Sequence, residues 1–120
     1  MRMNEIQLEG RLPIHSYGPG GFRIDGAWHD GSLVLTPTGR AAFSAPVDRA
    51  SLAPVLAEAE AIDVVLIGQG AEIAPLAAGL RAVIEEAQIG VEIMSTASAC
   101  RTYNVLLAED RRVAAVLVAL

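Results

Sequence analysis

The stretch from Ser95 to Arg112, STASACRTYNVLLAEDRR, decides how the second half of this chain folds. Its apolar residues recur at helical spacing, and Ser95 or Thr96 is a suitable N-cap because its hydroxyl can accept a backbone N–H. We therefore predict a helix from Thr96 to about Glu109. One face of this helix is expected to lie on a sheet and carries Ala99, Cys100, Tyr103, Leu106 and Leu107.

Polar residues of the same stretch lead to two further predictions. Asn104 is a poor residue for a helix interior, so we expect a specific hydrogen bond to hold it, either to backbone or to a ligand. Asp110 can adopt the left-handed conformation that often follows a helix, and Arg111 and Arg112 suit the negative end of the helix dipole. The sequence around Asp110 is therefore interpreted as a helix C-terminus.

Runs of branched apolar residues flank this helix. They predict strands at Val91–Met94 and Val113–Val118, and the run Ile62–Ile67 predicts the middle strand of the sheet. Two further helices are expected on either side of Ile62–Ile67. Alternation of strands and helices favours parallel pairing, so the second half is predicted to be an α/β sheet with helices packed on it.

The two further helices are expected from their first residues. The earlier one is predicted to be capped by Ser51, to tolerate Pro54 in its first turn and to continue to Ala59. The later one is predicted to open at Pro75, which has the dihedral angle of a first helical residue, and to carry Leu76 on its apolar face.

The N-terminal part of the chain shows short β-like runs separated by turn residues. These runs are Ile6–Leu8, Ile14–Tyr17, Phe22–Ile24 and Ser32–Thr36. Glycines and a proline at 18–21 predict a tight reversal, and Asp30–Gly31 predicts a second hairpin. We expect antiparallel strands here, and because no linker interrupts residues 1–120 we predict a single domain.

The composition restricts both partners and chemistry. Of the 120 residues, 52% are hydrophobic and 19% are charged, which indicates a packed globular protein. The net charge of -5 provides no basic field for a phosphate backbone, so nucleic acid is not an expected partner. All nine basic residues are arginine, which excludes a Schiff-base lysine and a phosphate-loop lysine.

Several features of the chain predict a cytoplasmic location. The opening MRMNEIQLEG lacks the apolar core of a signal peptide, and the longest apolar run, Val113–Leu120, is far shorter than the ~20 residues that span a bilayer. Cys100 is the single cysteine, so no internal disulfide can form, and with only two histidines no zinc-site spacing is present. We expect no metal, no cofactor and no transmembrane segment.

Gly68, Gln69 and Gly70 form a loop after the predicted middle strand and before the helix at Pro75. Backbone N–H groups and a helix dipole at such a place can hold an anion, but Ile73 stands where a dinucleotide-binding pattern needs its third glycine. A plain strand-to-helix turn that uses glycine for its dihedral angles is the favoured interpretation, and a ligand cradle is the alternative.

No catalytic residue can be assigned from the sequence. Cys100 lies near the start of the last helix beside Arg101, and both features can lower a thiol pKa, but a small buried hydrophobic residue is the favoured interpretation. His15 and His29 have no carboxylate at triad-like spacing, and no GxSxG serine is present.

Four blocks of the sequence resemble the Mth-type domain family. They are IHSYGPGGFRIDG (Ile14–Gly26), GSLVLTP (Gly31–Pro37), VVLIGQG (Val64–Gly70) and VEIMSTASACRTYNVLLAEDRRVAAVL (Val91–Leu117). The family includes mitochondrial complex I assembly factor three and many uncharacterised bacterial and archaeal proteins. The resemblance implies a single-domain α/β fold with a mixed β-sheet, helices packed on it and a small N-terminal antiparallel β layer. It implies no catalytic residues, and the lysine-free composition without a mitochondrial presequence indicates a bacterial protein.

Two functions remain open at this level. We favour a non-enzymatic protein-interaction or assembly-factor-like module that aids the assembly of a respiratory or other membrane-associated complex through an unidentified protein partner. The alternative is a small anionic-ligand-binding or enzymatic domain in which Gly68–Gly70 meets the start of the last helix. Arg101 would then pair with an anionic group, and Thr96 and Ser98 would offer hydroxyls.

Overall fold

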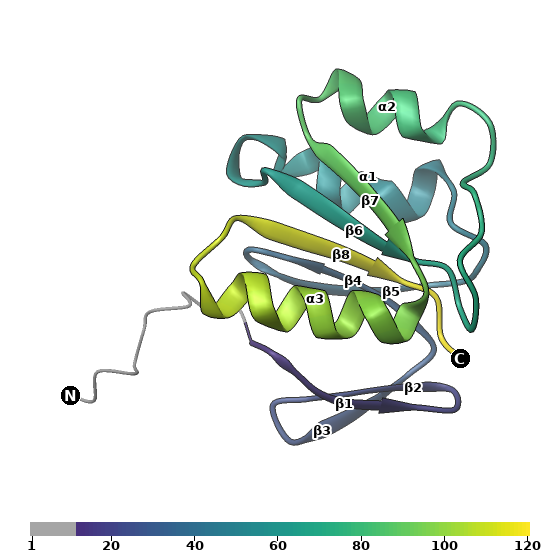
Figure 1. Ribbon diagram of the computed structural model, residues 1–120, viewed down its shortest axis with the longest axis vertical. Helices are drawn as coiled ribbons and strands as arrows, with labels where there is room; N and C mark the ends of the chain where they lie inside the picture. The colour runs from purple at the N-terminus through teal and green to yellow at the C-terminus, as the bar shows by residue number, and fades with distance from the viewer. Residues whose placement is uncertain (1–11) are drawn as a thin grey trace.

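The structure is a computed structural model that describes residues 12–120, and these residues form two β-sheets and three α-helices (Figure 1). The strands are β1 (Ile14–Gly18), β2 (Gly21–Ile24), β3 (Ala27–Asp30), β4 (Ser32–Thr36), β5 (Gly39–Phe43), β6 (Val64–Gly68), β7 (Gly90–Met94) and β8 (Val113–Leu117). The helices are α1 (Arg49–Ala57), the short 3₁₀ helix η1 (Ala59–Ala61), α2 (Leu80–Glu86) and α3 (Thr96–Ala108). The predicted α/β class, with a mixed sheet and an N-terminal antiparallel layer, is confirmed.

The larger sheet has five strands in the order β5-β4-β8-β6-β7. β6 runs parallel to β7 and β8, whereas β4 runs antiparallel to β5 and β8, so the sheet is mixed. The expectation that Ile62–Ile67 forms the middle of the sheet is wrong, because β8 holds the central place and β6 lies beside it. β8 suits that place because its sequence VAAVL is apolar throughout, and all five of its residues are buried.

Two apolar cores lie on opposite faces of this sheet, and the side chains of β8 alternate between them. Ala114 and Val116 belong to the core under α1 and α2, whereas Ala115 and Leu117 belong to the core under α3 and the small sheet. Figure 1 shows α3 in front of the larger sheet, α1 behind it, and the sheet of β1, β2 and β3 below α3. Each Leu, Ile or Phe fully buried in these cores stabilises the fold by about 1.5–3 kcal/mol.

The helix predicted from Ser95–Arg112 is confirmed. Ser95 is its N-cap, and the Ser95 hydroxyl oxygen accepts a hydrogen bond from the Ser98 backbone N–H at 3.2 Å. Tyr103 and Leu107 are each 1% exposed and pack into the core beneath the helix. Asp110 follows the helix with a φ of 60°, which is the left-handed conformation expected for it.

Antiparallel strands form in the N-terminal part, but only one of the two predicted reversals is a hairpin. The reversal at 18–21 joins β1 to β2 through Pro19 and Gly20. Asp30–Gly31 was expected to make a hairpin and does not, because it carries the chain from β3 in the small sheet to β4 in the large one. Gly31 makes this passage with a φ of 87°, which favours glycine. The predicted strand Ile6–Leu8 lies outside the described residues.

The other two helices begin at residues that differ from the prediction. Asp48, not Ser51, caps α1, because the Asp48 carboxylate accepts the backbone N–H of Ser51 at 2.8 Å and places Ser51 inside the helix. Pro54 consequently lies in the second turn of α1 rather than in the first. α2 begins at Leu80 and not at Pro75, because Gly79 adopts a left-handed φ of 86° immediately before it.

Candidate functional site

The loop Gly68–Gly70 and the N-terminus of α3 meet in the structure. The backbone N–H of Thr96 donates to the Gly70 carbonyl at 2.8 Å, and the Gly70 N–H donates to the Thr96 hydroxyl oxygen at 2.8 Å. That hydroxyl in turn donates to the Val118 carbonyl at 2.7 Å. The loop, the helix and the residue after β8 are therefore joined at the carboxyl ends of the parallel strands.

The structure explains why residues 68 and 70 of this loop are both glycine. A Cβ atom at Gly68 would lie 2.8 Å from the Thr96 Cα and 3.1 Å from the Ala99 Cβ, so only glycine lets the loop pack on α3. Gly70 has a φ of 98°, a conformation that favours glycine. Thr96 is 0% exposed, and its hydroxyl already has two backbone partners. A ligand role for these residues stays a prediction.

Arg101 and Ser98 form a small polar cluster with Tyr17 at the surface between α3 and β1. The Arg101 guanidinium donates to the hydroxyls of Tyr17 and Ser98, at 3.3 Å each. Within residues 12–120 no carboxylate forms an ion pair with Arg101. Gln69 lies apart from this cluster, since its side-chain amide donates to the Pro75 carbonyl at 3.1 Å. The cluster thus presents a positive charge to solvent.

Cys100 is buried in the core beneath α3 and is 2% exposed. Burial raises the pKa of the Cys100 thiol to about 12, and the nearby charge of Arg101 opposes this rise only in part. The thiol is therefore protonated at neutral pH, and the position near the helix start does not make it a nucleophile. The interpretation of Cys100 as a small buried hydrophobic residue is confirmed.

Asn104 makes the specific hydrogen bonds that its place in a helix predicted, and its partner is backbone. Its Oδ1 accepts from the Ile14 N–H at 2.8 Å, and its Nδ2 donates to the Ile14 carbonyl at 2.8 Å. A neighbouring antiparallel strand would engage the same two groups of β1. Since β1 is an edge of the small sheet, the side chain of Asn104 covers that edge at Ile14.

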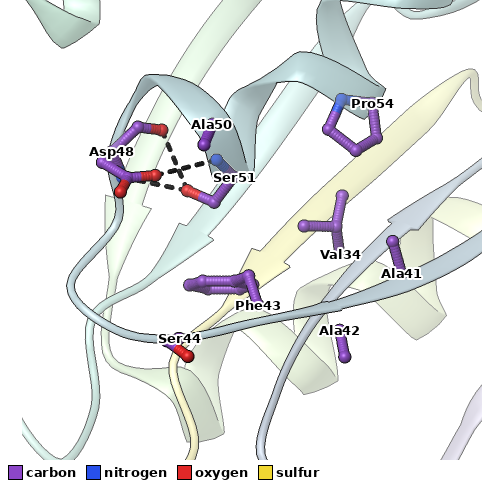
Figure 2. A pocket seen from close by; sticks show the side chains of 9 residues that line it. All are labelled: Val34, Ala41, Ala42, Phe43, Ser44, Asp48, Ala50, Ser51 and Pro54. Carbon is purple, nitrogen blue, oxygen red and sulfur yellow. Dashed lines mark hydrogen bonds between the residues drawn. The ribbon is translucent and has the colours of Figure 1, made fainter.

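A hollow lies between β5 and the start of α1, and no sequence motif had indicated it. Its volume is about 350 Å³, and Figure 2 shows the side chains around it. They are Val34, Ala41, Ala42, Phe43, Ser44, Asp48, Ala50, Ser51 and Pro54. Most of this lining is apolar, so the hollow is suited to an aliphatic side chain.

The polar groups of this hollow bond to one another. The Asp48 N–H donates to the Ser51 hydroxyl oxygen at 2.9 Å, and that hydroxyl donates to the Asp48 carbonyl at 2.9 Å. The dashed lines in Figure 2 mark these bonds and the one from the Ser51 N–H to the Asp48 carboxylate. Both residues cap α1, and these bonds hold the rim of the hollow in place.

β5 also borders a second hollow, of about 480 Å³, which lies toward β3. Its lining includes an arginine and a histidine and consists of Trp28, His29, Asp30, Leu33, Arg40, Ala41 and Ala42. Trp28 is 40% exposed, and its indole N–H donates to the Asp30 carboxylate at 2.8 Å. The Arg23 guanidinium lies 5.8 Å from the centre of the Trp28 ring, within the range of a cation–π contact. Residues of β5 therefore line both hollows.

The described part of the chain contains neither a metal-binding cluster nor a helix suited to span a membrane. No group of three or more His, Cys, Asp or Glu side chains in residues 12–120 is arranged to hold a metal ion. None of the helices in the same range combines the length and the apolar character that crossing a bilayer requires.

Comparison with known sequences relates this chain to proteins from bacteria and an animal. Residues 14–118 match a family described as proteins of unknown function, DUF498/DUF598. An uncharacterised protein of Rhodobacter capsulatus is 44% identical over 117 residues, which cover 98% of this chain and 92% of that protein. NADH dehydrogenase (ubiquinone) 1 alpha subcomplex assembly factor 3 of Danio rerio is 30% identical over 109 residues, which cover 88% of this chain and 63% of that protein.

Solved structures share the same fold. The crystal structure of a protein described as an outer membrane protein from Bartonella henselae has a TM-score of 0.88 and 43% identity, and the match covers 92% of this chain and 96% of that one. The solution structure of a Mth938-like domain protein from Bordetella pertussis has a TM-score of 0.72 and 29% identity, with 89% and 85% of the two chains covered.

Proposed function

The chain belongs to the DUF498/DUF598 family of proteins of unknown function, and from this membership we propose that it is a non-enzymatic protein-interaction module that aids the assembly of a membrane-associated respiratory complex. The resemblance to Mth-type domains that the sequence indicated is confirmed by the family match and by the Mth938-like structure. We base the proposed function on the similarity to assembly factor 3 of Danio rerio, whose name states its role.

One observation carries this proposal. The 30% identity with the Danio rerio assembly factor extends over 109 residues and 88% of this chain, so the two proteins share the fold as a whole and not one short motif. The match leaves more than a third of the Danio rerio protein uncovered, and the assembly role is therefore a proposal for this chain.

The contacts of the candidate site residues support an interaction module over an enzyme. Thr96 and Gly70 bond to each other, and Thr96 also bonds to Val118, so their polar groups hold the fold together. Cys100 is buried and protonated at neutral pH. The hollows beside β5 combine apolar and polar side chains, a mixture that suits contact with another polypeptide.

Removal of the gene from its host tests the proposal. We expect the deletion strain to contain less fully assembled respiratory NADH dehydrogenase, with smaller subcomplexes accumulating, when its membranes are separated by native electrophoresis. A plasmid copy of the wild-type chain should restore the assembled complex, which is the matched control. Normal amounts of every respiratory complex in the deletion strain would contradict the proposed function.

We further propose that the chain acts on the cytoplasmic side of the membrane. The Bartonella henselae protein with the same fold is described as an outer membrane protein, so the location of this chain needs its own measurement. Fractionation of host cells should find the chain with the cytoplasm and, through its partner, with the inner membrane. Recovery of the chain with the outer membrane would contradict this placement.

The alternative function is binding of a small anion at the cluster of Arg101, Ser98 and Tyr17. The observation in its favour is the exposed guanidinium of Arg101 beside two hydroxyl groups. The test uses inorganic phosphate and citrate as probes in calorimetry, with Arg101→Glu as the variant and Arg49→Glu, which makes the same charge change on α1, as the control. Loss of binding in Arg101→Glu alone would support a site, and no heat with the wild-type chain would exclude these anions.

A further inference from the structure

We propose that the outer edge of β5 binds an extended segment of a partner protein as an added β-strand, with an aliphatic side chain of that segment in the hollow beside α1. This inference rests on the proposed function, because it names the surface through which an interaction module would act. It commits to one kind of partner, an extended polypeptide with an aliphatic and an acidic residue on opposite faces.

The sheet edges in residues 12–120 are β1, β3, β5 and β7. An open edge presents unpaired N–H and C=O groups, and most proteins protect it. Asn104 closes β1 at Ile14. At β7 the Arg81 guanidinium donates to the Val91 carbonyl at 3.4 Å. No group in residues 12–120 bonds to the outer edge of β5, so this edge remains open.

The two hollows lie where side chains of an added strand would point. Ala41 pairs with Val34, which belongs to the core under α1, whereas Ala42 pairs with Leu33, which belongs to the core under the small sheet. Because side chains alternate along a strand, a segment added to β5 would direct successive side chains toward these two faces. One hollow lies on each face beside β5, whereas the open edge of β3 borders only the second hollow. Modules that bind peptides by strand addition obtain affinity from backbone bonds and specificity from such alternate pockets.

The two hollows differ in the chemistry of their lining. The hollow beside α1 is lined mainly by apolar groups, including Val34, Phe43 and Pro54, and has room for a side chain of the size of valine or leucine. Arg40 borders the other hollow, is exposed, and has no carboxylate partner in the described part of the chain. An acidic side chain on the added strand would pair with it. The short side chains of Gly39, Ala41 and Ala42 leave the backbone of β5 accessible.

The test is a selection from a displayed library of random twelve-residue peptides with the full chain as bait. We expect enriched peptides to carry an aliphatic and an acidic residue at adjacent positions. The synthetic peptides should bind with changes in the backbone amide signals of Gly39–Phe43 in the NMR spectrum. Signals that move only elsewhere, or a selection that enriches no peptide, would overturn the proposal.

Two variants sharpen the test. Ala41→Leu fills the hollow beside α1 and should weaken peptide binding about tenfold or more, because the aliphatic side chain loses its buried place. Arg40→Glu should weaken binding about two- to fivefold and should prefer a peptide whose acidic residue is replaced by lysine. Ala108→Leu, at an exposed alanine of α3, is the control and should bind like the wild-type chain. Equal affinity of all four proteins would overturn the proposal.

A second copy of this chain is the competing occupant. If sedimentation shows a dimer that Ala41→Leu dissociates, then β5 pairs with itself and the proposed partner is wrong. The two proposals also fail separately. If the deletion strain assembles its respiratory complexes normally while peptides bind at β5, the proposed function fails and the strand-addition site stands. If the deletion impairs assembly and Ala41→Leu restores it without binding peptide, the site fails and the function stands.

Discussion

Asn104 of α3 holds Ile14 of β1 by both of its backbone polar groups, at 2.8 Å for each bond. A helix side chain thereby takes the place of a neighbouring strand. The two elements are 90 residues apart in sequence, so this contact fixes the small sheet against the layer that α3 forms on the large one. It is the clearest case in the molecule of one side chain that sets the position of a whole element.

Replacement of Asn104 by alanine should lower the free energy of unfolding by about 1–3 kcal/mol, because the N–H and C=O of Ile14 lose their partners. Asn104→Asp should also destabilise the fold, since a carboxylate cannot donate to the Ile14 carbonyl. Urea unfolding measures both effects. Val105→Ala is the matched control because Val105 is 55% exposed on the same helix, and it should change stability by less than about 0.5 kcal/mol. Equal losses in Asn104→Ala and the control would refute the role given to Asn104.

Thr96→Val should destabilise the chain by about 2 kcal/mol or more, because the buried Gly70 N–H and the Val118 carbonyl lose the hydroxyl that joins them. Thr96→Ser keeps that hydroxyl and should cost clearly less. Thermal unfolding of the two variants provides the comparison. If serine and valine prove equally harmful, the loss of shape rather than of the hydrogen bonds is responsible.

Asp63 and Arg112 form a pair in which the guanidinium donates to both carboxylate oxygens, at 3.2 and 2.8 Å. The hydrogen bond from Arg112 lowers the pKa of Asp63 below its usual value. Each side chain is about half exposed, at 53% for Arg112 and 52% for Asp63, so solvent screens the pair and its effect is small.

The sign of the pH effect follows from this lowered pKa. As the pH falls, Asp63 takes up its proton at a higher pH in the unfolded chain than in the folded chain. The pair therefore stabilises the fold above a pH of about 4, and this contribution is lost as the pH falls through the pKa of Asp63 in the folded chain. Asp63→Asn should therefore melt below the wild-type chain at pH 7, and the two melting temperatures should converge near a pH of about 2. A difference that stays constant across this range would contradict the assignment.

The Cys100 thiol should react very slowly while the chain is folded. With a pKa raised to about 12 by burial, only on the order of one thiol in 10⁴ is ionised at pH 8, and the sulfur is also shielded from reagents. Iodoacetamide labelling followed by mass spectrometry should show little adduct in buffer and complete adduct in urea. Labelling at the same rate in both conditions would place the thiol at the surface and refute its burial.

Elements with a strong pattern could be predicted from the sequence. α3 was found with its N-cap because Ser95 precedes a clear apolar stripe, and β8 was found because its five residues are all apolar. The strands β3 and β5 were missed. Their sequences AWHD and GRAAF contain no run of branched apolar residues, and as edge strands they are largely exposed, so their partners rather than their own residues determine their structure.

The order of the strands could not be predicted, because β6 and β8 are both apolar and buried. β8 is central because β4, from the other half of the chain, pairs with it, and Leu33 of β4 lies opposite Leu117 of β8. Such distant pairing leaves no local mark on the sequence. The start of α2 was misplaced for a similar reason, because the left-handed conformation of Gly79 depends on the loop around it.

The candidate site was partly predictable. Gly68–Gly70 and the start of α3 meet because parallel strands end at the same edge of a sheet, and the alternation of strands and helices in the sequence indicated this. The use of the Thr96 hydroxyl within the fold could not be read from its residue type. The hollow between β5 and α1 was missed. The capping pattern of Asp48 and Ser51 and the two neighbouring alanines of β5 were available as signals.

The central place of β8 also bears on how the chain is made. β4 and β6 both precede β8 in the sequence, yet each pairs with it, so in a nascent chain each of these two strands lacks one neighbour until Val113–Leu117 has emerged from the ribosome. During that interval the apolar residues of both strands are open to chaperones and to other unfinished copies. Rapid synthesis of this protein should therefore favour inclusion bodies, and slower synthesis should favour the native product.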